Sequence, residues 1–241
     1  MVDASAPLAL VTGSASGIGL AIGQALLDSG HRVLGLDLTA ADDGTPFART
    51  YACDITDEQR VRAVAAEIAA DEGEVTALVH CAGWSPHGNF LDSTPESDER
   101  VVAVNYLGLL HLVRTFAPPM VAARNGRIVV IASDAARIGV RGEAVYAGAK
   151  AAEIAFAKSL AVELARSQVT VNVVSPGTTN TPLLREMLTD EQIEKRRRAN
   201  PMQRIGEPAD VAAAAEFFTR PESSYITGQV LSVNGGMARV D

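Results

Sequence analysis

A tyrosine and a lysine four residues apart, Tyr146 and Lys150, form a pair that could move a proton. They open the apolar-rich segment VYAGAKAAEIAFAK, which has the composition of a helix. Residues i and i+4 share one face of a helix, so the two side chains lie one turn apart. The pKa of a free tyrosine is about 10, and a neighbouring ammonium lowers it by stabilising the phenolate. The pair predicts a tyrosine acid/base; taken alone, it also fits a surface tyrosine beside a solvated lysine.

Ser133 stands thirteen residues before Tyr146 and ends the β-branched run GRIVVIAS. The last residue of a parallel strand lies at the carboxyl edge of the sheet, where open α/β folds bind their ligands. We therefore expect the Ser133 hydroxyl to hold a substrate oxygen close to Tyr146.

A glycine-rich stretch after the first apolar run predicts a dinucleotide site. Glycines let the backbone approach a ligand, and the N-terminus of the following helix offers free N–H groups to a pyrophosphate. The spacing G-x-x-x-G-x-G differs from the usual G-x-G-x-x-G, so an ordinary strand-to-helix turn is the alternative. The stretch GSASGIG contains Gly13, Ser16, Gly17, Ile18 and Gly19.

Asp37 ends the second apolar run, 18 residues after Gly19. A carboxylate at this place can accept hydrogen bonds from both ribose hydroxyls of an adenosine and repels a 2'-phosphate. Neither Ser16 nor Leu38, where a phosphate clamp could lie, is basic. These residues predict NAD(H), preferred over NADP(H).

The elements that must position these residues follow an alternating pattern. Short apolar runs alternate with segments of helical period, which is typical of a parallel sheet covered by helices on both faces. We predict a single-domain, Rossmann-like, doubly wound α/β fold over residues 1–241, with the polar segment 178–206 as an insertion over one end of the sheet. The seven predicted strands are 8–12, 31–37, 49–53, 77–83, 126–133, 169–175 and 229–233.

Helix starts are marked by capping residues and by proline at the first helical position. Four such signals occur: Thr56 with Gln59, Thr94 with Pro95, Thr189 with Gln192, and Pro208.

Composition narrows the class of protein. A net charge of -8 and a pI of about 5.1 argue against a nucleic-acid surface. No apolar run approaches the roughly 20 residues needed to cross a bilayer, and the segment MVDASAP lacks signal-peptide features, so we expect a cytoplasmic protein. We interpret Cys53 and Cys81 as free thiols and His80 and His87 as structural, and we expect no metal site.

These motifs together resemble the short-chain dehydrogenase/reductase family over essentially the whole chain. The resemblance implies that Tyr146 is the catalytic acid/base and that Lys150 lowers its pKa and binds the nicotinamide ribose. It implies that Ser133 orients the carbonyl or alcohol and that Asn105 supports a water-linked proton relay. The motifs are TGSASGIG, Asp54 in CDIT, Asn105 in VAVNYLG, Ser133, Tyr146 with Lys150, and Pro176 with Gly177.

The resemblance also implies the other contacts of the cofactor and a homotetramer. Asp54 is expected near the adenine, Thr181 near the carboxamide, and 178–206 as a mobile substrate lid. One motif differs from the family pattern, because His80-Cys81-Ala82-Gly83 replaces the usual Asn-Asn-Ala-Gly. Which side chain stabilises the central sheet at this place is therefore left open. The expected cofactor residues are Gly13, Ser16, Gly17, Ile18, Gly19, Asp37, Asp54, Ile55, Ala82, Gly83, Tyr146, Lys150, Pro176, Gly177 and Thr181.

The stretch from Ser133 to Tyr146 is where the substrate is expected to be chosen. It is similar to the same stretch in 2-hydroxycyclohexanecarboxyl-CoA dehydrogenases, and its start and the short link from Asp37 to Arg49 resemble 2,3-dihydro-2,3-dihydroxybenzoate dehydrogenases. These likenesses favour an alicyclic secondary alcohol, carboxylated or as its CoA thioester. Candidate substrate residues are Trp84, Asp134, Arg137 and Arg141, with a phosphate-binding cluster at Lys195–Arg198; packing and solvated loops are the alternatives.

Two other functions compete with this hypothesis. A reductase of 3-oxoacyl groups on carrier protein or CoA shares the fold and the catalytic residues, but would normally prefer NADPH, against which Asp37 counts. A non-catalytic NAD-sensing or scaffold protein would not need Tyr146 and Lys150, and both are present.

Overall fold

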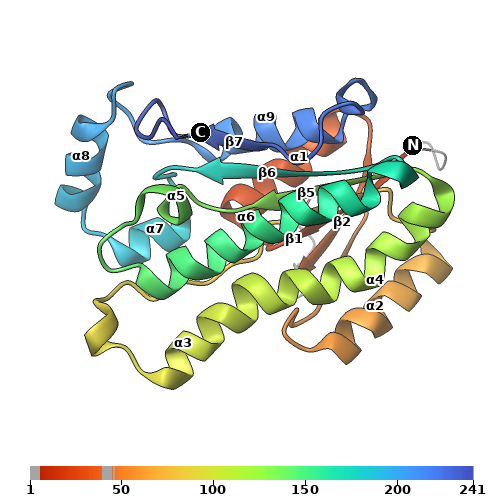
Figure 1. Ribbon diagram of the computed structural model, residues 1–241, viewed down its shortest axis with the longest axis horizontal. Coiled ribbons are helices and arrows are strands. Elements are labelled where there is room, and N and C mark those ends of the chain that lie inside the picture. Colours follow the sequence, from red (N-terminus) through yellow and green to blue (C-terminus); the bar gives the residue numbers. More distant parts are fainter. Residues whose placement is uncertain (1–5, 40–44, 46, 241) are drawn as a thin grey trace.

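The computed structural model describes residues 6–39, 45 and 47–240; the amino-terminal MVDAS and part of the link from Asp37 to Arg49 lie outside them. All seven strands are parallel and form one sheet in the order β3-β2-β1-β4-β5-β6-β7 (Figure 1). Every predicted strand is confirmed, with β4 and β5 ending earlier than expected. The strands are β1 (Leu8–Thr12), β2 (Arg32–Asp37), β3 (Arg49–Ala52), β4 (Ala77–His80), β5 (Gly126–Ile131), β6 (Val169–Pro176) and β7 (Val230–Val233).

The chain builds this sheet outwards in two directions from its centre. It runs from β1 to β3 on one side and returns to β4 beside β1 before continuing to β7 on the other side. The reversal between β1 and β4 is the topological switch point, beyond whose carboxyl edge ligands bind in open α/β sheets.

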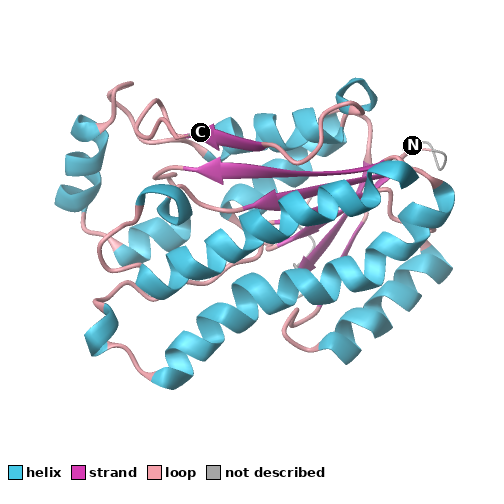
Figure 2. Cartoon of the chain, in the orientation of Figure 1, coloured by secondary structure: helices cyan, strands magenta, loops and turns pink. Residues whose placement is uncertain are grey.

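Helices cover both faces of the sheet (Figure 2). Those on one face are α2, α4 and α6, and α1 and α9 lie on the other. The helices are α1 (Gly17–Asp28), α2 (Glu58–Asp71), α3 (Pro95–Val102), α4 (Gly108–Ala123), α5 (Ala135–Ile138), α6 (Ala144–Leu164), α7 (Pro182–Met187), α8 (Asp190–Ala199) and α9 (Pro208–Thr219). A π-helical turn, Ala103–Leu107, joins α3 to α4, and 3₁₀ turns lie at Phe90–Asp92, Ala165–Ser167 and Pro221–Ser223.

Two apolar cores hold the three layers together. Ile68, Leu112 and Leu160 pack from α2, α4 and α6 onto one face of the sheet, while Ile22 and Phe218 pack from α1 and α9 onto the other. Full burial of such side chains contributes about 1.5–3 kcal/mol each. The sheet edge that carries the site is therefore fixed from both sides.

The longest helical run among the described residues is Pro95–Ala123, which is rich in apolar residues. By length and composition alone it could cross a membrane, a test that core helices of water-soluble proteins also pass. An apolar helix of this length was not expected from the sequence. Here Leu109, Leu112 and Met120 of this run are fully or almost fully buried against the sheet, so we interpret it as a core helix.

Three of the four predicted helix starts are confirmed. Thr94 caps α3 before Pro95, Thr189 forms the capping box of α8, and Pro208 opens α9. The prediction for α2 is wrong, because Asp57 is its cap and accepts the N–H groups of the first turn. The Thr56 hydroxyl instead donates to Asp54 (2.7 Å).

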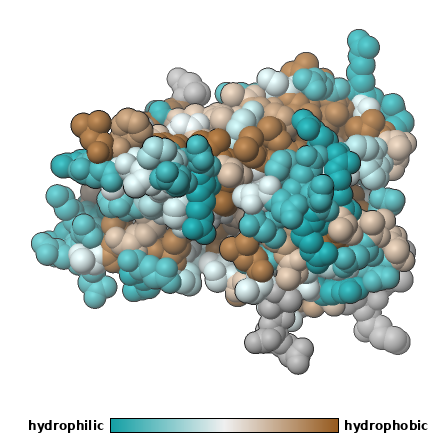
Figure 3. Space-filling view, turned by 90° about the horizontal axis from the view of Figure 1, so that it is seen from below, coloured by the Kyte–Doolittle hydropathy of each residue, from teal (hydrophilic) through white to brown (hydrophobic). Residues whose placement is uncertain are grey.

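The two cysteines agree with the prediction of free thiols. Cys53 and Cys81 are free, and burial raises the pKa of the Cys53 thiol to about 11. On the face seen in Figure 3, hydrophilic and apolar side chains are interspersed.

Candidate active site

A cleft of about 1610 Å³ lies at the carboxyl edge of the sheet. In Figure 1 the arrowheads of β5, β6 and β7 point towards this end, where α5, α7 and α8 lie. All the cofactor residues expected from the resemblance line the cleft, together with Ser133 and Trp84. The structure therefore brings the glycine loop, Asp37 and the Tyr146–Lys150 pair to one cavity.

The glycine loop is shaped to hold a phosphate. Gly13 has a φ of 66°, and a Cβ built on it would lie 2.9 Å from the backbone of Ala82, so a larger residue would not fit. The side chain of Ser16, the N-cap of α1, makes no capping hydrogen bond. The N–H groups of the first turn of α1 are thus left for an anion, which the positive end of the helix dipole also attracts.

Asp37 lines the cleft beside the glycine loop. The part of the cleft lined by the glycine loop, Asp37 and Asp54 is called the cofactor half below. Its carboxylate accepts hydrogen bonds from the N–H groups of Ala15 (2.9 Å) and Leu38 (2.8 Å), which fix its orientation. Each carboxylate oxygen keeps a further acceptor site for a ribose hydroxyl. The sequence from Leu38 to Ala48 contains no Lys or Arg, and Arg49 pairs with Asp71. These residues leave acceptors for the adenosine ribose of a nicotinamide cofactor, and the preference for NAD(H) over NADP(H) stays a prediction.

His80 begins the changed motif His80-Cys81-Ala82-Gly83, and its side chain contacts the neighbouring strand β1. It is fully buried, with Nδ1 3.3 Å from the Thr12 hydroxyl and Nε2 3.3 Å from the carbonyl oxygen of Asn105. Thr12 in turn accepts the N–H groups of Cys81 (3.1 Å) and Ala82 (3.0 Å). The imidazole therefore joins β1 and β4 to the π-helical turn, and the structural role predicted for it is consistent with these contacts.

The residues predicted to transfer the proton come from the end of β5 and the start of α6. Ser133 follows β5, while Tyr146 and Lys150 occupy the first two turns of α6. The Lys150 ammonium lies 5.8 Å from the centre of the Tyr146 ring and donates to the carbonyl oxygen of Ile131 (2.9 Å). A hydrogen bond with Ser133 also acts on Tyr146. The predicted spacing thus places a hydroxyl, a phenol and an ammonium together.

The acidity of Tyr146 differs from the sequence expectation. Burial raises its pKa, and the opposing effects of the Lys150 charge and the Ser133 hydrogen bond do not cancel this increase. The predicted lowering by Lys150 is present, but the pKa of Tyr146 is raised overall, so the residue is a phenol at neutral pH. Burial acts to lower the pKa of Lys150, and the Glu153 and Tyr146 side chains more than offset it, so Lys150 remains an ammonium.

Asn105 lies behind the cleft in the π-helical turn. Its amide nitrogen donates to the carbonyl oxygens of Trp84 (2.7 Å) and Val101 (2.8 Å). Its Oδ1 is buried and has no hydrogen-bond partner among the described residues. A Cβ on Gly83 would lie 2.9 Å from this oxygen and 3.6 Å from Lys150 Nζ. The proton relay implied for Asn105 stays a prediction, supported by this free acceptor beside Lys150.

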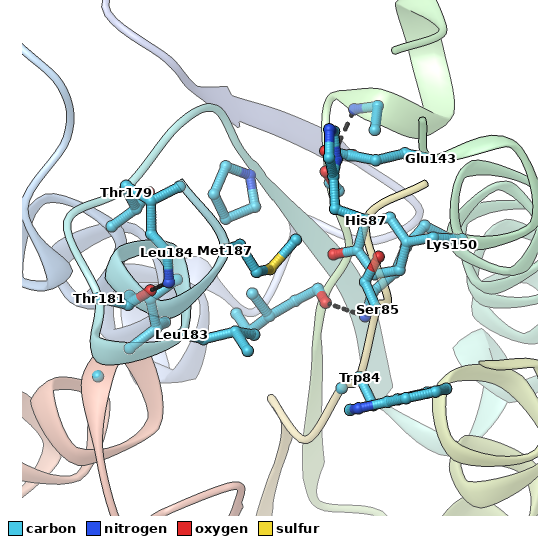
Figure 4. Close-up of a pocket in the computed structure, with 18 of the residues that line it drawn as sticks. Trp84, Ser85, His87, Glu143, Lys150, Thr179, Thr181, Leu183, Leu184 and Met187 are labelled. Carbon is cyan, nitrogen blue, oxygen red and sulfur yellow. Dashed lines mark hydrogen bonds between the residues drawn. The ribbon is translucent and has the colours of Figure 1, made fainter. Parts of the chain in front are cut away.

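The part of the cleft between Trp84 and α7, called the substrate half below, has an apolar wall. Figure 4 shows Leu183, Leu184 and Met187 of the α7 region facing Trp84 and Lys150 across the cavity. The Arg100 guanidinium stacks on the Trp84 ring at 4.5 Å from its centre, which fixes the indole as a wall. This half can hold an apolar group next to Tyr146.

Two of the candidate substrate residues have other partners in the structure. The buried Asp134 carboxylate accepts hydrogen bonds from Ser175 (2.8 Å), Ser232 (2.9 Å) and Asn234. Arg137 is not among the lining residues and donates to the Ser232 hydroxyl (2.8 Å) and the Val240 carbonyl (2.6 Å). Both therefore tie the end of β5 to the carboxyl-terminal segment, but Asp134 also lines the cleft, and contact of either residue with substrate stays a prediction. Arg141 is exposed and lines the cleft.

The segment 178–206 lies over the cleft and carries α7 and α8. Thr181, the N-cap of α7, lies against the glycine loop, since a Cβ on Gly17 would be 3.3 Å from its methyl group. Of the basic cluster, Arg197 and Arg198 pair with Glu194, whose pKa they hold at about 2. Lys195 and Arg196 line the cleft. The mobility of this lid remains a prediction.

Two acidic residues of the site were missed. Glu143, three residues before Tyr146, lines the cleft, and burial raises its pKa despite Arg196 and His87 nearby. Glu153 is fully buried beside Lys150. A carboxylate inside the apolar stretch KAAEIAFA is a signal that could have revealed Glu153. His87, interpreted as structural from the sequence, also lines the cleft.

Comparison with known proteins places the chain among oxidoreductases. Residues 13–238 match the family model described as enoyl-(acyl carrier protein) reductase. The chain is 36% identical to the 3-oxoacyl-[acyl-carrier-protein] reductase MabA of Mycobacterium tuberculosis over 230 residues, covering 95% of this chain and 91% of the relative. It is 35% identical to the 3-oxoacyl-[acyl-carrier-protein] reductase FabG of Escherichia coli over 241 residues, covering 97% and 98%.

Solved structures show the same fold. The aldohexose dehydrogenase AldT of Thermoplasma acidophilum, in ligand-free form, superposes with a TM-score of 0.90 at 31% identity, covering 100% of this chain and 98% of that chain. ElxO with NADP bound superposes with a TM-score of 0.90 at 26% identity, covering 96% and 98%. The relatives named here are 3-oxoacyl reductases rather than the two ring-alcohol dehydrogenases that the 133–146 stretch suggested. The family match over residues 13–238 and the relatives at 35–36% identity show that the chain belongs to the short-chain dehydrogenase/reductase family.

Proposed function

We propose that the protein is an NAD(H)-dependent reductase of 3-oxoacyl thioesters. One observation carries the proposal: Tyr146, a phenol between Ser133 and the Lys150 ammonium, lines the same cleft as Asp37. A proton donor and an adenosine-binding carboxylate at two ends of one cavity are what a nicotinamide-linked carbonyl reduction requires.

The residues of the chain divide the proton chemistry between them. A bound nicotinamide supplies the hydride that reaches the carbonyl carbon. Ser133 donates a hydrogen bond to the carbonyl oxygen, and Tyr146 gives its phenolic proton to that oxygen as the alcohol forms. The Lys150 ammonium stabilises the phenolate that remains. The raised pKa of Tyr146 supports the reductive direction, because the residue carries its proton at neutral pH.

The substrate half of the cleft supports an acyl thioester. Leu183, Leu184 and Met187 offer an apolar wall for an acyl chain, and Lys195 and Arg196 offer cations for a phosphate of CoA or of a carrier-protein arm. The names of the relatives, MabA and FabG, agree with this class of substrate. Asp37 supports NADH as the reductant, although one structural neighbour has NADP bound.

A ring alcohol, carboxylated or as its thioester, is the second candidate substrate. Glu143 favours it, because its carboxylate lines the cleft three residues from Tyr146 and makes no hydrogen bond with another described residue. Such an acceptor can take the hydroxyl of a substrate that carries several of them. The similarity of the fold to an aldohexose dehydrogenase adds support.

The experiment is a pair of substrate screens followed by absorbance of the reduced nicotinamide. We expect NADH to be consumed with acetoacetyl-CoA and longer 3-oxoacyl thioesters, with a higher kcat/KM than for NADPH. Turnover of cyclic hydroxy acids with NAD, and none of the thioesters, would replace the proposal by the second candidate. Binding of NADH without turnover of any substrate would favour the NAD-sensing or scaffold protein.

The homotetramer and the cytoplasmic location remain predictions beside this proposal. Sedimentation equilibrium of the purified chain tests the first, since a tetramer has four times the 25.2 kDa of the chain.

A further inference from the structure

Glu153 is a buried carboxylate that the proposed reaction does not use. It lies three residues after Lys150 on α6 and has no exposed surface. Both of its oxygens accept hydrogen bonds from the Lys150 ammonium, at 2.9 and 3.1 Å. A buried charge is unfavourable unless it is paired and hydrogen-bonded, so each member of this pair depends on the other.

Other groups that can titrate surround the pair on each packed element. At the end of β4, His80 Nε2 lies 3.7 Å from Glu153 Oε1. The next residue is Cys81, and burial raises the pKa of its thiol to about 12 although the Lys150 charge acts to lower it. From α6, Tyr146 and Glu143 complete the set. Lys150 is the cation with the largest effect on the pKa of Tyr146, and Glu153 lies against it.

This arrangement changes the field that reaches the phenol. An ammonium close to a tyrosine lowers the pKa of the phenol by about 1–3 units when it is not neutralised. A carboxylate in direct contact with the ammonium cancels much of that field, because the two charges act on the phenol as a dipole. The raised pKa of Tyr146, to which Glu153 contributes after burial, agrees with this cancellation.

We propose that Glu153 is a positioning residue that holds the Lys150 ammonium in the site and weakens its effect on Tyr146, so that the phenol keeps its proton for carbonyl reduction. The inference rests on the proposed function for its meaning in catalysis. It adds that the reverse reaction, alcohol oxidation, needs the phenolate and is confined to more alkaline pH. A chain without Glu153 would oxidise alcohols at lower pH.

The first test is the ionisation of Tyr146 in the protein without added cofactor or substrate. Tyrosinate absorbance is titrated for the wild type and for Glu153→Gln, each against the matching Tyr146→Phe protein, which removes the signal of the other tyrosines. We expect Glu153→Gln to lower the pKa of Tyr146 by at least about one unit. An unchanged or higher pKa overturns the proposal. Glu163→Gln, at an exposed position of the same helix, is the matched control and is expected to change nothing.

The second test is the pH profile of turnover. In Glu153→Gln the acidic limb of alcohol oxidation is expected to move to lower pH by the same amount, whereas a merely structural role would lower the rate at every pH alike. Glu153→Asp keeps the charge and is expected to restore most of the wild-type profile.

Two further results keep the inference separate from folding and from the choice of substrate. If circular dichroism shows that Glu153→Gln is unfolded, the wild-type titration decides, because a Tyr146 pKa below the ordinary value of about 10 overturns the proposal. The titration needs no substrate, so failure of every thioester to react would reject the proposed function and leave this inference standing.

Discussion

The two halves of the cleft differ in how firmly their polar side chains are held. In the cofactor half, backbone N–H groups of Ala15 and Leu38 fix Asp37, and the backbone N–H and hydroxyl of Thr56 fix Asp54. In the substrate half, Arg141 and Lys195 are exposed and make no hydrogen bond through their side chains with other described residues.

This difference teaches where specificity resides. A pre-organised half binds its ligand without losing side-chain freedom, so it suits a cofactor that stays the same. A half lined by adaptable side chains can change its ligand with few substitutions. Under the proposed function, the cofactor is selected by one half of the cleft and the substrate by the other.

The largest effect is expected where the halves meet. Tyr146→Phe removes the proton donor and is expected to lower kcat by at least about 100-fold. Binding of NADH, followed by its fluorescence, should change little because the phenyl ring remains. Wild-type activity in this variant would show that another group donates the proton.

The next effect tests the cofactor half. Asp37→Ala removes charged hydrogen bonds to the ribose and the repulsion of a 2'-phosphate. We therefore expect the ratio of kcat/KM for NADH to kcat/KM for NADPH to fall by about tenfold or more. Asp28→Ala, at an exposed position outside the cleft, is the control. A ratio that stays constant in Asp37→Ala would mean that cofactor choice lies elsewhere.

The smallest effect tests the substrate half. Lys195→Ala is expected to raise KM for a CoA thioester about two- to fivefold, an effect that added salt should weaken. Arg198→Ala on the same helix is the matched control, because Arg198 pairs with Glu194 and does not line the cleft. If both variants behave alike, the phosphate site is not at Lys195.

The same division explains what could be predicted from the sequence. The strands, the glycine loop and Asp37 were predicted because local patterns specify them: apolar runs, a turn that needs glycine, and a carboxylate at the end of a strand. Asp134 and Arg137 lie in an equally suggestive stretch, but their partners Ser232 and Asn234 are about a hundred residues away along the chain. No local pattern announces such a contact.

The buried charges escaped prediction for a related reason. Glu153 looks like a solvated helix residue until the packing of α6 against the sheet removes it from water. The overall rise in the pKa of Tyr146 follows from the same burial, which a pairwise argument about Tyr146 and Lys150 does not include. The error in the cap of α2 is smaller, a shift from Thr56 to the adjacent Asp57.

The ends of the segment 178–206 meet. The Gly206 N–H donates to the Thr178 carbonyl (2.9 Å), and the Asn180 N–H donates to the Gly206 carbonyl (2.8 Å). A loop closed at its base can lengthen or shorten with only a slow change in closure entropy and without disturbing the strands beneath it. The segment can therefore be replaced as one unit. Replacing it by the matching loop of a relative is a way to change the substrate while the strands and the predicted catalytic residues stay the same.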